Sequence, residues 1–356
     1  MNNLETIWKQ HAYHEKSFLL SLICWPLSLL YRIGSYLKRG FFERWTFKQI
    51  IVDDPVITIG NLTVGGSGKT PLTMYIAEYL QSLEFNCHIV SRGYGSDYHG
   101  QFAHYDGQWD KPGFFGDEVE SYISRLPDAR LSVGKQRGLL IHKYSKSVYR
   151  QVYILDDALQ YWRLKKDFQI ILVHGKYLFG NKERFPHGPL REDIEELKRA
   201  SIVIVYSPEH SQEYYEDYLG TTNLFFAFQK IMSFEDKSGE LIRISELKKM
   251  KCISVCSIAH PESFKNSIEA LGIELVHSFD FPDHHLYTAE DKNQIQEYVE
   301  KNEIDYLLIT EKDRPKFKSE SNQVLTSRLD LKINDSKRFT DIIDQYIASK
   351  TKIVLE

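Results

Sequence analysis

The chain has few cysteines, and their spacing excludes one class of protein at once. Its 356 residues contain four cysteines, and no two of them form a Cys-x-x-Cys pair. Small secreted domains that depend on disulfides have a much higher cysteine density. Cys252 and Cys256 lie in the apolar run 251–257, which indicates a buried strand. We therefore expect inert core thiols in a reducing compartment.

The chain also lacks a strong excess of charge of either sign. A formal net charge of −4 argues against a general nucleic-acid binder. The cations are unevenly spread, because a short basic collar contains only one acid, Glu43. The collar consists of Arg32, Lys38, Arg39, Arg44 and Lys48. We expect it to face anionic lipid headgroups.

No hydrophobic run is long enough to be an unambiguous membrane span. The longest uncharged stretch lies between Lys16 and Arg32 and contains Pro26, whereas a spanning helix needs about 20 apolar residues. No small-residue cleavage site follows, which argues against a secretory signal. We predict that residues 1–49 are membrane-associated helices, with Trp25 and Tyr31 at the depth of the lipid interface. A buried core helix is the alternative.

From about residue 50, short apolar runs alternate with helical stretches, which is typical of βαβ units. The length favours two domains. The pattern predicts an α/β fold, with a P-loop NTPase-type parallel sheet covered by helices on both faces. The strands are expected at Val56–Ile59, Cys87–Ser91, Arg130–Val133, Val152–Leu155, Gln169–Val173 and Ile202–Tyr206.

Two later segments, 222–232 and 324–333, alternate apolar and polar residues and so predict half-buried strands. We expect them to form a two-stranded antiparallel connector between a P-loop domain at 50–221 and a smaller α/β domain at 248–320. The last helix, 336–350, is expected to return to the first domain.

A glycine-rich segment follows the first strand and opens a helix, as a phosphate-binding loop does. The strict P-loop pattern has a glycine at the position where this chain has Thr63. The remaining glycines still permit the backbone to approach a phosphate group. We expect Lys69 to bind the β- and γ-phosphates of ATP and Thr70 to bind Mg²⁺. The predicted nucleotide-binding residues are Gly65, Gly66, Ser67, Gly68, Lys69 and Thr70.

A second part of the nucleotide site is indicated by the apolar strand that ends in Asp156 and Asp157. This is the form of a Walker B element, whose carboxylate holds Mg²⁺. Many strands end in aspartate, so the pattern is informative mainly because the glycine-rich loop belongs to the same sheet.

Several further motifs follow one another in a fixed order along the chain. They are Gly60-Asn-Leu-Thr-Val-Gly-Gly-Ser-Gly-Lys-Thr-Pro71, Ser91-Arg-Gly-Tyr-Gly95, Gly116-Asp-Glu118, Val133-Gly-Lys-Gln-Arg137, Asp156-Asp-Ala-Leu-Gln160, Gly188-Pro-Leu-Arg-Glu192, Phe281-Pro-Asp-His-His285 and Thr310-Glu-Lys-Asp313. Together these motifs make the chain similar to one family, the tetraacyldisaccharide 4′-kinases of lipid A biosynthesis. Two residues, Ala158 and Tyr161, depart from the family's Asp-Asp-Gly-Phe-Gln-His segment.

The resemblance implies an ATP-dependent phosphorylation of the 4′-hydroxyl of an acylated glucosamine disaccharide, at the cytoplasmic face of the bacterial inner membrane. It implies that Asp117 is the catalytic base, assisted by His284, and that Glu192 helps to hold Mg²⁺. Taken alone, Gly-Asp-Glu is also typical of a helix N-cap.

For the lipid we predict phosphate contacts from arginine, because guanidinium binds phosphate oxygens in a bidentate manner. The predicted lipid-binding residues are Arg92, Tyr94, Arg137 and Gln160.

Two other functions remain open at this point, a P-loop GTPase and an ATPase coupled to transport or to metal or cofactor insertion. Thr310-Glu-Lys-Asp313 is similar to a guanine-reading loop, although Lys312 stands one position late. A transport ATPase would need a Leu-Ser-Gly-Gly type of loop, which the chain lacks.

Overall fold

The structure is a computed structural model that describes residues 2–14, 17–45, 49–65, 68–97, 102–144, 150–221, 223–258, 261–283, 285–317 and 323–351. Its residues form two compact units. Unit 1 comprises Met1–Phe115, Arg125–Phe228 and Lys332–Glu356, and unit 2 comprises Gly116–Ser124 and Gln229–Leu331. His284, Gly66 and Ser67, which the sequence assigns to the site, lie outside the described residues.

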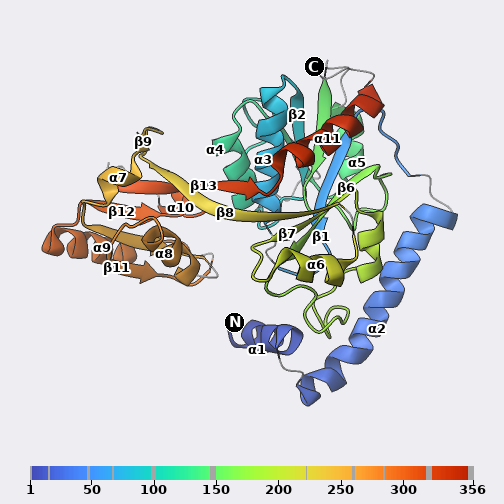
Figure 1. The fold of residues 1–356 in the computed structure, drawn as a ribbon, viewed down its shortest axis with the longest axis horizontal. Helices are drawn as coiled ribbons and strands as arrows, with labels where there is room; N and C mark the ends of the chain where they lie inside the picture. Colours follow the sequence, from blue (N-terminus) through green and yellow to red (C-terminus); the bar gives the residue numbers. More distant parts are fainter. Residues whose placement is uncertain are drawn as a thin grey trace. The chain divides into compact units, whose positions relative to one another are not determined.

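Unit 1 is built on a mostly parallel sheet in the order β8-β7-β6-β1-β5-β2-β4-β3 (Figure 1). Within this order, and among the pairings described, only β3, at the edge, pairs antiparallel with its neighbour β4. The strands are β1 (Val56–Asn61), β2 (Asn86–Ser91), β3 (Phe102–Tyr105), β4 (Arg130–Gly134), β5 (Gln151–Leu155), β6 (Phe168–His174), β7 (Ile202–Tyr206) and β8 (Leu224–Glu235).

The central strands are buried along their whole length, because helices cover a parallel sheet on both faces. Every residue of β1 and β5 is buried. This confirms the α/β prediction, and the six expected strands are present. The sequence did not indicate β3, since a four-residue edge strand has too little apolar periodicity to be recognised. The helices of unit 1 that follow the N-terminal segment are α3 (Lys69–Ser82), α5 (Arg137–Tyr144), η2 (Ile194–Arg199), α6 (Gln212–Leu219) and α11 (Ser336–Thr351).

The strand order determines where the site is built. β1 lies between β5 and β6, and the chain leaves β1 through α3 to reach β2 on the far side of β5. Because β1 and β5 are parallel, their carboxyl ends meet at one edge of the sheet. The loop after Asn61 and the turn at Asp156–Asp157 are therefore neighbours, at the switch point where α/β sheets bind ligands.

The final helix, α11, belongs to unit 1. The ring of Tyr346 stacks on Phe168 with centroids 4.6 Å apart, and its hydroxyl donates to the carbonyl of Val56. Phe339 is fully buried and its ring contacts Phe225. The end of the chain thus supports the start of β1, the strand that carries the glycine-rich loop.

Unit 2 has a parallel sheet in the order β11-β10-β12-β13, with one core cluster around Cys252 and Cys256 and another around Tyr287 and Phe317. All four cysteines of the chain are free and buried. The chain enters this unit within β8 and leaves it within β13. The elements are β9 (Leu241–Ile242), α7 (Ile244–Leu247), β10 (Cys252–Cys256), α8 (Pro261–Glu269), β11 (Leu275–Asp280), α9 (Ala289–Asn302), β12 (Tyr306–Ile309), α10 (Arg314–Phe317) and β13 (Val324–Ile333).

All of α4 (Asp117–Arg125) except its last residue is grouped with unit 2 rather than with the P-loop unit. From the sequence we expected this segment in the domain at 50–221, and that boundary stays a prediction. Asp117 makes a long-range ion pair with Lys316 of α10, at 3.6 Å. A single ion pair of this kind cannot be recognised from residues so far apart in the sequence.

The N-terminal segment forms α1 (Asn2–Tyr13), α2 (Phe18–Gly40) and a π-helical turn, η1 (Phe41–Trp45), all within unit 1 (Figure 1). α1 is anchored: Trp8 Nε1 donates to the carbonyl of Pro186 at 2.7 Å, and Ala12 is fully buried. α2 with the following turn is the one segment, Phe18–Glu43, that is long and apolar enough to cross a membrane among the described residues.

Candidate active site

The glycine-rich loop connects β1 to α3 and has the backbone that phosphate binding requires. Gly65 and Gly68 have φ values of 118° and 79°, which residues with a Cβ rarely adopt. Gly68 is the N-cap of α3 and offers no side chain to the first turn, so the main-chain N–H groups at this end face outward. A Cβ on Gly68 would lie 2.5 Å from the ring of Tyr206. The loop therefore forms an anion-binding site at the N-terminus of α3, and the ring of Tyr206 packs closely beneath Gly68.

The loop is held in place by contacts from three parts of unit 1. The Asn61 amide donates to the carbonyl of Gly65, and the Tyr13 hydroxyl of α1 donates to the carbonyl of Val64. The Val64 N–H donates to the carbonyl of Pro189. These contacts hold the loop before any nucleotide binds.

Lys69 and Asp157 come together at this edge of the sheet. Lys69 Nζ lies 3.8 Å from Asp157 Oδ1, and both oxygens of Asp157 accept from the guanidinium of Arg191, at 2.8 and 3.1 Å. Burial would raise the pKa of Asp157, but the Arg191 hydrogen bonds and the Lys69 charge outweigh it and lower that pKa to about 2. The carboxylate is thus ionised throughout the neutral range.

Arg191 also binds the loop itself. Its Nη2 donates to the side-chain oxygen of Asn61 and, at 3.3 Å, to the Asn61 carbonyl. One guanidinium therefore joins the end of β1 to the turn after β5. Sequence reasoning missed Arg191 because it selected Glu192 from the same Gly-Pro-Leu-Arg-Glu motif. Arg191 could have been recognised as an arginine in a family motif, because its planar guanidinium can bind two groups at once and two phosphate-binding segments were already predicted.

Asp156 directly follows β5 and is almost fully buried. The same turn is supported by Arg137, whose Nη1 donates to the carbonyls of Asp156 and Asp157 at 2.6 and 2.8 Å. Arg137 is itself buried, and its guanidinium stacks over the ring of Tyr161. This position makes it a support of the turn, and its expected contact with lipid phosphate stays a prediction.

The two departures from the family motif have structural explanations. Ala158 is fully buried in a core cluster beside Leu155, where a small side chain fits. The Tyr161 hydroxyl accepts a hydrogen bond from the N–H of Gly138 at 3.0 Å, in the first turn of α5. Both residues thus stabilise the scaffold around Arg137.

Glu192 lies in a different environment from Lys69. It is buried, and burial raises its pKa, while the charge of Arg184, whose Nη1 is 3.7 Å away, opposes that rise. The other charges that act on it belong to Glu196, Arg39 and Lys166. The expected role of Glu192 as a magnesium ligand stays a prediction.

The expected lipid-binding residues differ in exposure. Arg92 is exposed and Tyr94 has 84% of its surface exposed, in a loop where Gly93 and Gly95 have positive φ values. Gln160 donates to the carbonyl of Asn61 at 3.3 Å, which places it at the end of β1. The Arg92 side chain fits a contact with an incoming phosphate group better than the buried Arg137.

The GTPase alternative loses its main argument in unit 2. Asp313, the residue that would read a guanine base, is fully buried. Its carboxylate accepts hydrogen bonds from Ser257, Tyr287 and Thr310. A carboxylate engaged in this way is part of the core and does not face a base.

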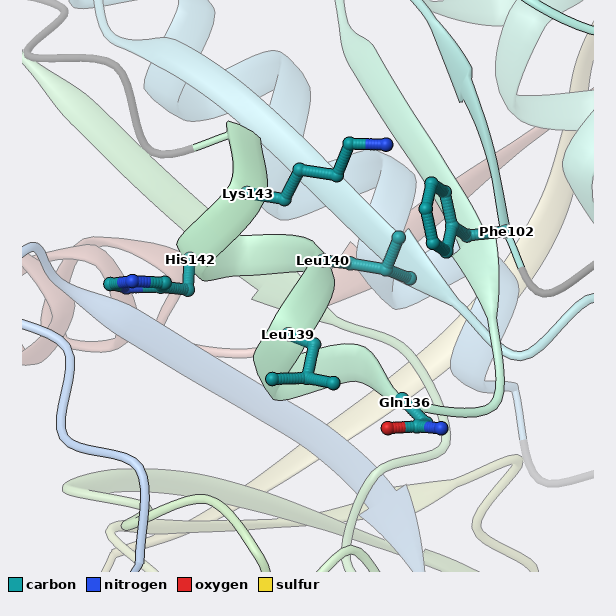
Figure 2. Close-up of a pocket in the computed structure, with 6 residues that line it drawn as sticks. All are labelled: Phe102, Gln136, Leu139, Leu140, His142 and Lys143. Carbon is teal, nitrogen blue, oxygen red and sulfur yellow. The ribbon is translucent and has the colours of Figure 1, made fainter.

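A cavity of about 320 Å³ lies between α5 and β3, apart from the residues described above. Figure 2 shows its mixed apolar and basic lining, with the ammonium of Lys143 above the ring of Phe102, 3.8 Å from its centroid. Its walls contain none of the predicted catalytic or nucleotide-binding residues. The lining residues are Phe102, Gln136, Leu139, Leu140, His142 and Lys143.

We predict that Arg191→Met lowers the urea midpoint of unfolding at pH 7 and that the deficit shrinks in acid. A carboxyl whose pKa is lowered on folding, here from 3.8 to about 2, stabilises the protein above about pH 4 and ceases to do so as the pH falls towards 2. Urea titrations between pH 7 and pH 2.5 measure this. Arg92→Met, which removes an exposed arginine, is the matched control and should change little. A deficit of Arg191→Met that is independent of pH would contradict the assignment.

Comparisons with known proteins agree with this geometry. The family model for tetraacyldisaccharide-1-P 4′-kinase matches residues 20–348. A tetraacyldisaccharide 4′-kinase from Halothermothrix orenii is 32% identical over 322 residues, covering 84% of this chain and 83% of the relative. One from Vibrio cholerae is 30% identical over 317 residues, covering 88% and 87%.

Among solved structures, the crystal structure of LpxK from Aquifex aeolicus in complex with ATP is similar, with a TM-score of 0.71. The two sequences are 26% identical, and the match covers 90% of this chain and 98% of that one. Taken with the family model over most of the sequence, the chain belongs to the tetraacyldisaccharide-1-P 4′-kinase family.

Proposed function

We propose that this protein transfers the γ-phosphoryl group of ATP to the 4′-hydroxyl of a tetraacyl glucosamine disaccharide 1-phosphate, a step of lipid A biosynthesis. One observation carries the proposal: Lys69 stands at the N-terminus of α3, 3.8 Å from Asp157, in a chain of a kinase family. A lysine in this position neutralises charge on the β- and γ-phosphates.

The residues present fit a magnesium ion at the same edge. Mg²⁺ takes hard oxygen ligands and is usually held by one or two carboxylates together with substrate phosphates and water. The Thr70 hydroxyl and the Asp156 carboxylate are the oxygen donors that would hold it, and Asp157 is engaged with Lys69 and Arg191. The ion would offset charge on the transferring phosphoryl group. The described residues form no ready-made cluster of three metal-binding side chains.

For the acceptor, the proposal assigns the catalytic base to Asp117, assisted by His284. A sugar hydroxyl is a poor nucleophile, so a carboxylate that accepts its proton as the phosphoryl group moves accelerates transfer. Asp117 is the first residue of α4, and Gly116 before it has a φ of 104°. We place Arg92 and Tyr94 on the lipid, with Gln160 beside the nucleotide loop.

Membrane binding is proposed for α2, and its contacts support a helix that lies in the plane of the interface. The less exposed residues of α2 follow one narrow stripe, which includes Ser21, Cys24, Ser28 and Arg39. Near one end Ser21 contacts His187, and at the other Arg39 pairs with Glu196.

These two contacts are 18 residues apart, a rise of about 27 Å along the helix. Since both ends of the stripe are bound to the same unit, a perpendicular helix would draw that unit into the bilayer. The remaining faces expose a band of large apolar side chains. They are Phe18, Leu19, Leu22, Ile23, Trp25, Leu27, Leu29, Leu30, Ile33, Tyr36 and Leu37.

One cation of the expected basic collar has another role. Arg39 pairs with Glu43 and Glu196, and its guanidinium lies over the ring of Trp162. It therefore secures α2 to unit 1, which leaves Arg32 and Lys38 as the exposed cations of α2 for anionic headgroups. The cytoplasmic face of the bacterial inner membrane is the surface we propose.

Lys69→Ala should lower phosphoryl transfer by at least about 10²-fold without unfolding, because a contact to charge that develops in the transition state has that scale. Transfer of radiolabel from ATP to a monophosphorylated, acylated glucosamine disaccharide measures it after lipid extraction. Lys165→Ala, at an exposed lysine, is the control. Near-wild-type transfer by Lys69→Ala would refute the nucleotide site.

Asp117→Asn and His284→Ala should each lose kcat by about 10²–10⁴-fold with little change in ATP affinity, since general-base terms have that scale. The double variant should be scarcely slower than either single one, because the two groups act as a unit. Steady-state kinetics with both substrates test this. If the kcat losses of the two single variants multiply in the double variant, the two residues do not act as a unit. If Asp117→Asn is as active as the wild type, the Gly-Asp-Glu turn is only a helix cap.

Replacing Leu19, Leu22 and Ile23 together by serine should move the protein from anionic vesicles into solution. Each such side chain contributes roughly 1.5–3 kcal/mol when buried, so the partition coefficient should fall by several powers of ten. The KM for the lipid should rise while that for ATP stays the same. Sedimentation with phosphatidylglycerol vesicles measures the partition.

Leu241→Ser, at an exposed leucine of unit 2, is the matched control. Deletion of the whole segment is a poorer test, because α1 is packed against unit 1. Undiminished sedimentation of the triple variant would contradict the proposal. Cysteines placed at Ser17 and Lys38, near the two ends of α2, should both react with an impermeant reagent from the same side of the vesicle, whereas a spanning helix would expose only one.

A further inference from the structure

Lys316 is a buried cation in unit 2 that the mechanism above does not use. Only 6% of its side chain is exposed, although it lies on the short helix α10. Burial of an ammonium group is costly unless an anion or hydrogen-bond acceptor compensates it. Its Nζ lies 3.6 Å from Asp117 Oδ2 and 3.4 Å from the Ser257 hydroxyl. Among the described residues, the proposed base is therefore one of the partners that stabilise this charge.

The position of Lys316 is imposed by a hydrogen-bonded core. Asp313 Oδ1 accepts from the hydroxyl of Ser257 at 2.5 Å and from that of Tyr287 at 3.0 Å, and its Oδ2 accepts from Thr310 Oγ1 at 2.5 Å. Burial, and then the charge of Asp313, raise the pKa of Tyr287 well above its usual range, so its phenol stays a donor. Every polar group in this cluster is engaged.

The same residue directs the backbone of α10. The carbonyl of Asp313 accepts from the N–H of Lys316 at 3.0 Å and of Phe317 at 2.7 Å. Phe317 is buried, with its ring 5.1 Å from that of Tyr287. The Thr-Glu-Lys-Asp motif, which is similar in sequence to a guanine-reading loop, thus sets the backbone direction at Lys316.

We propose that Lys316 is a positioning residue that holds the Asp117 carboxylate in its working orientation. The proposal rests on the proposed function of Asp117 as the base. A base works only when its oxygen faces the acceptor hydroxyl, and a displacement of about 1 Å can cost 10²-fold in rate. Because the core holds Lys316 in place, its ammonium restricts the orientation of the Asp117 carboxylate. The backbone at the start of α4 does not by itself determine the side-chain torsions of Asp117.

Lys316→Met tests the role of the charge, because it keeps the length and the apolar stem of the side chain. It should lower kcat by about 10–10²-fold, with the KM for ATP and for the lipid changed by less than about twofold. Lys316→Arg should recover a substantial part of the lost kcat, since it restores the cation. Lys312→Met, at an exposed lysine of the same motif, is the matched control and should behave as the wild type.

The double variant Asp117→Asn, Lys316→Met distinguishes action through Asp117 from an independent effect. If Lys316 works through the carboxylate, the double variant should be no slower than Asp117→Asn alone. Multiplying losses, or equal loss in Lys316→Met and Lys316→Arg, would overturn the proposal. Circular dichroism melts of each variant verify the fold, and if Lys316→Met does not fold, Lys316→Gln provides the same comparison.

Two outcomes distinguish the role of Lys316 from that of Asp117 as the base. Near-wild-type transfer by Asp117→Asn would refute the proposed base, whatever Lys316 does. A strongly impaired Asp117→Asn together with a fully active Lys316→Met would refute only the positioning role.

Discussion

The contacts of the Asp157 carboxylate with Arg191 and Lys69 are the interactions on which the rest of unit 1 depends. The carboxylate accepts two hydrogen bonds from Arg191 and lies within ion-pair distance of Lys69, and Arg191 also binds Asn61 at the end of β1. The loop and the turn after β5 are thereby fixed relative to each other before a nucleotide binds. A preorganised charge costs no rearrangement at the moment of transfer, which is why this arrangement suits phosphoryl chemistry.

Supporting structure converges on this pair of segments from distant parts of the chain. Arg137 holds the carbonyls of Asp156 and Asp157, and Tyr13 of α1 binds the carbonyl of Val64. The helix α1 is thus tied to the nucleotide loop as well as adjoining α2. The helix α1 therefore connects the nucleotide loop to α2, the helix for which membrane binding is proposed.

Unit 2 follows the same principle with a different anion. Asp313 is fully buried and accepts hydrogen bonds from hydroxyl groups and from a main-chain N–H of several segments. The nearby ammonium of Lys316 pairs with Asp117. In each unit, an aspartate that accepts several hydrogen bonds helps to position a lysine near a residue of the proposed mechanism. Asp157 does so for Lys69 in unit 1, and Asp313 does so for Lys316 in unit 2.

The sequence by itself determined the parallel sheet, the glycine-rich loop with Lys69, and the family, because these depend on local periodicity and on contiguous motifs. Only the tertiary structure decided that Arg191 joins two strand ends, that Arg137 faces inward, that Glu192 belongs with Arg184, and that Asp117 lies with Lys316 in unit 2. Each of these is a pairing between charged groups. Several donors in the chain could satisfy any one carboxylate, and only the packing of the backbone selects which of them comes within reach.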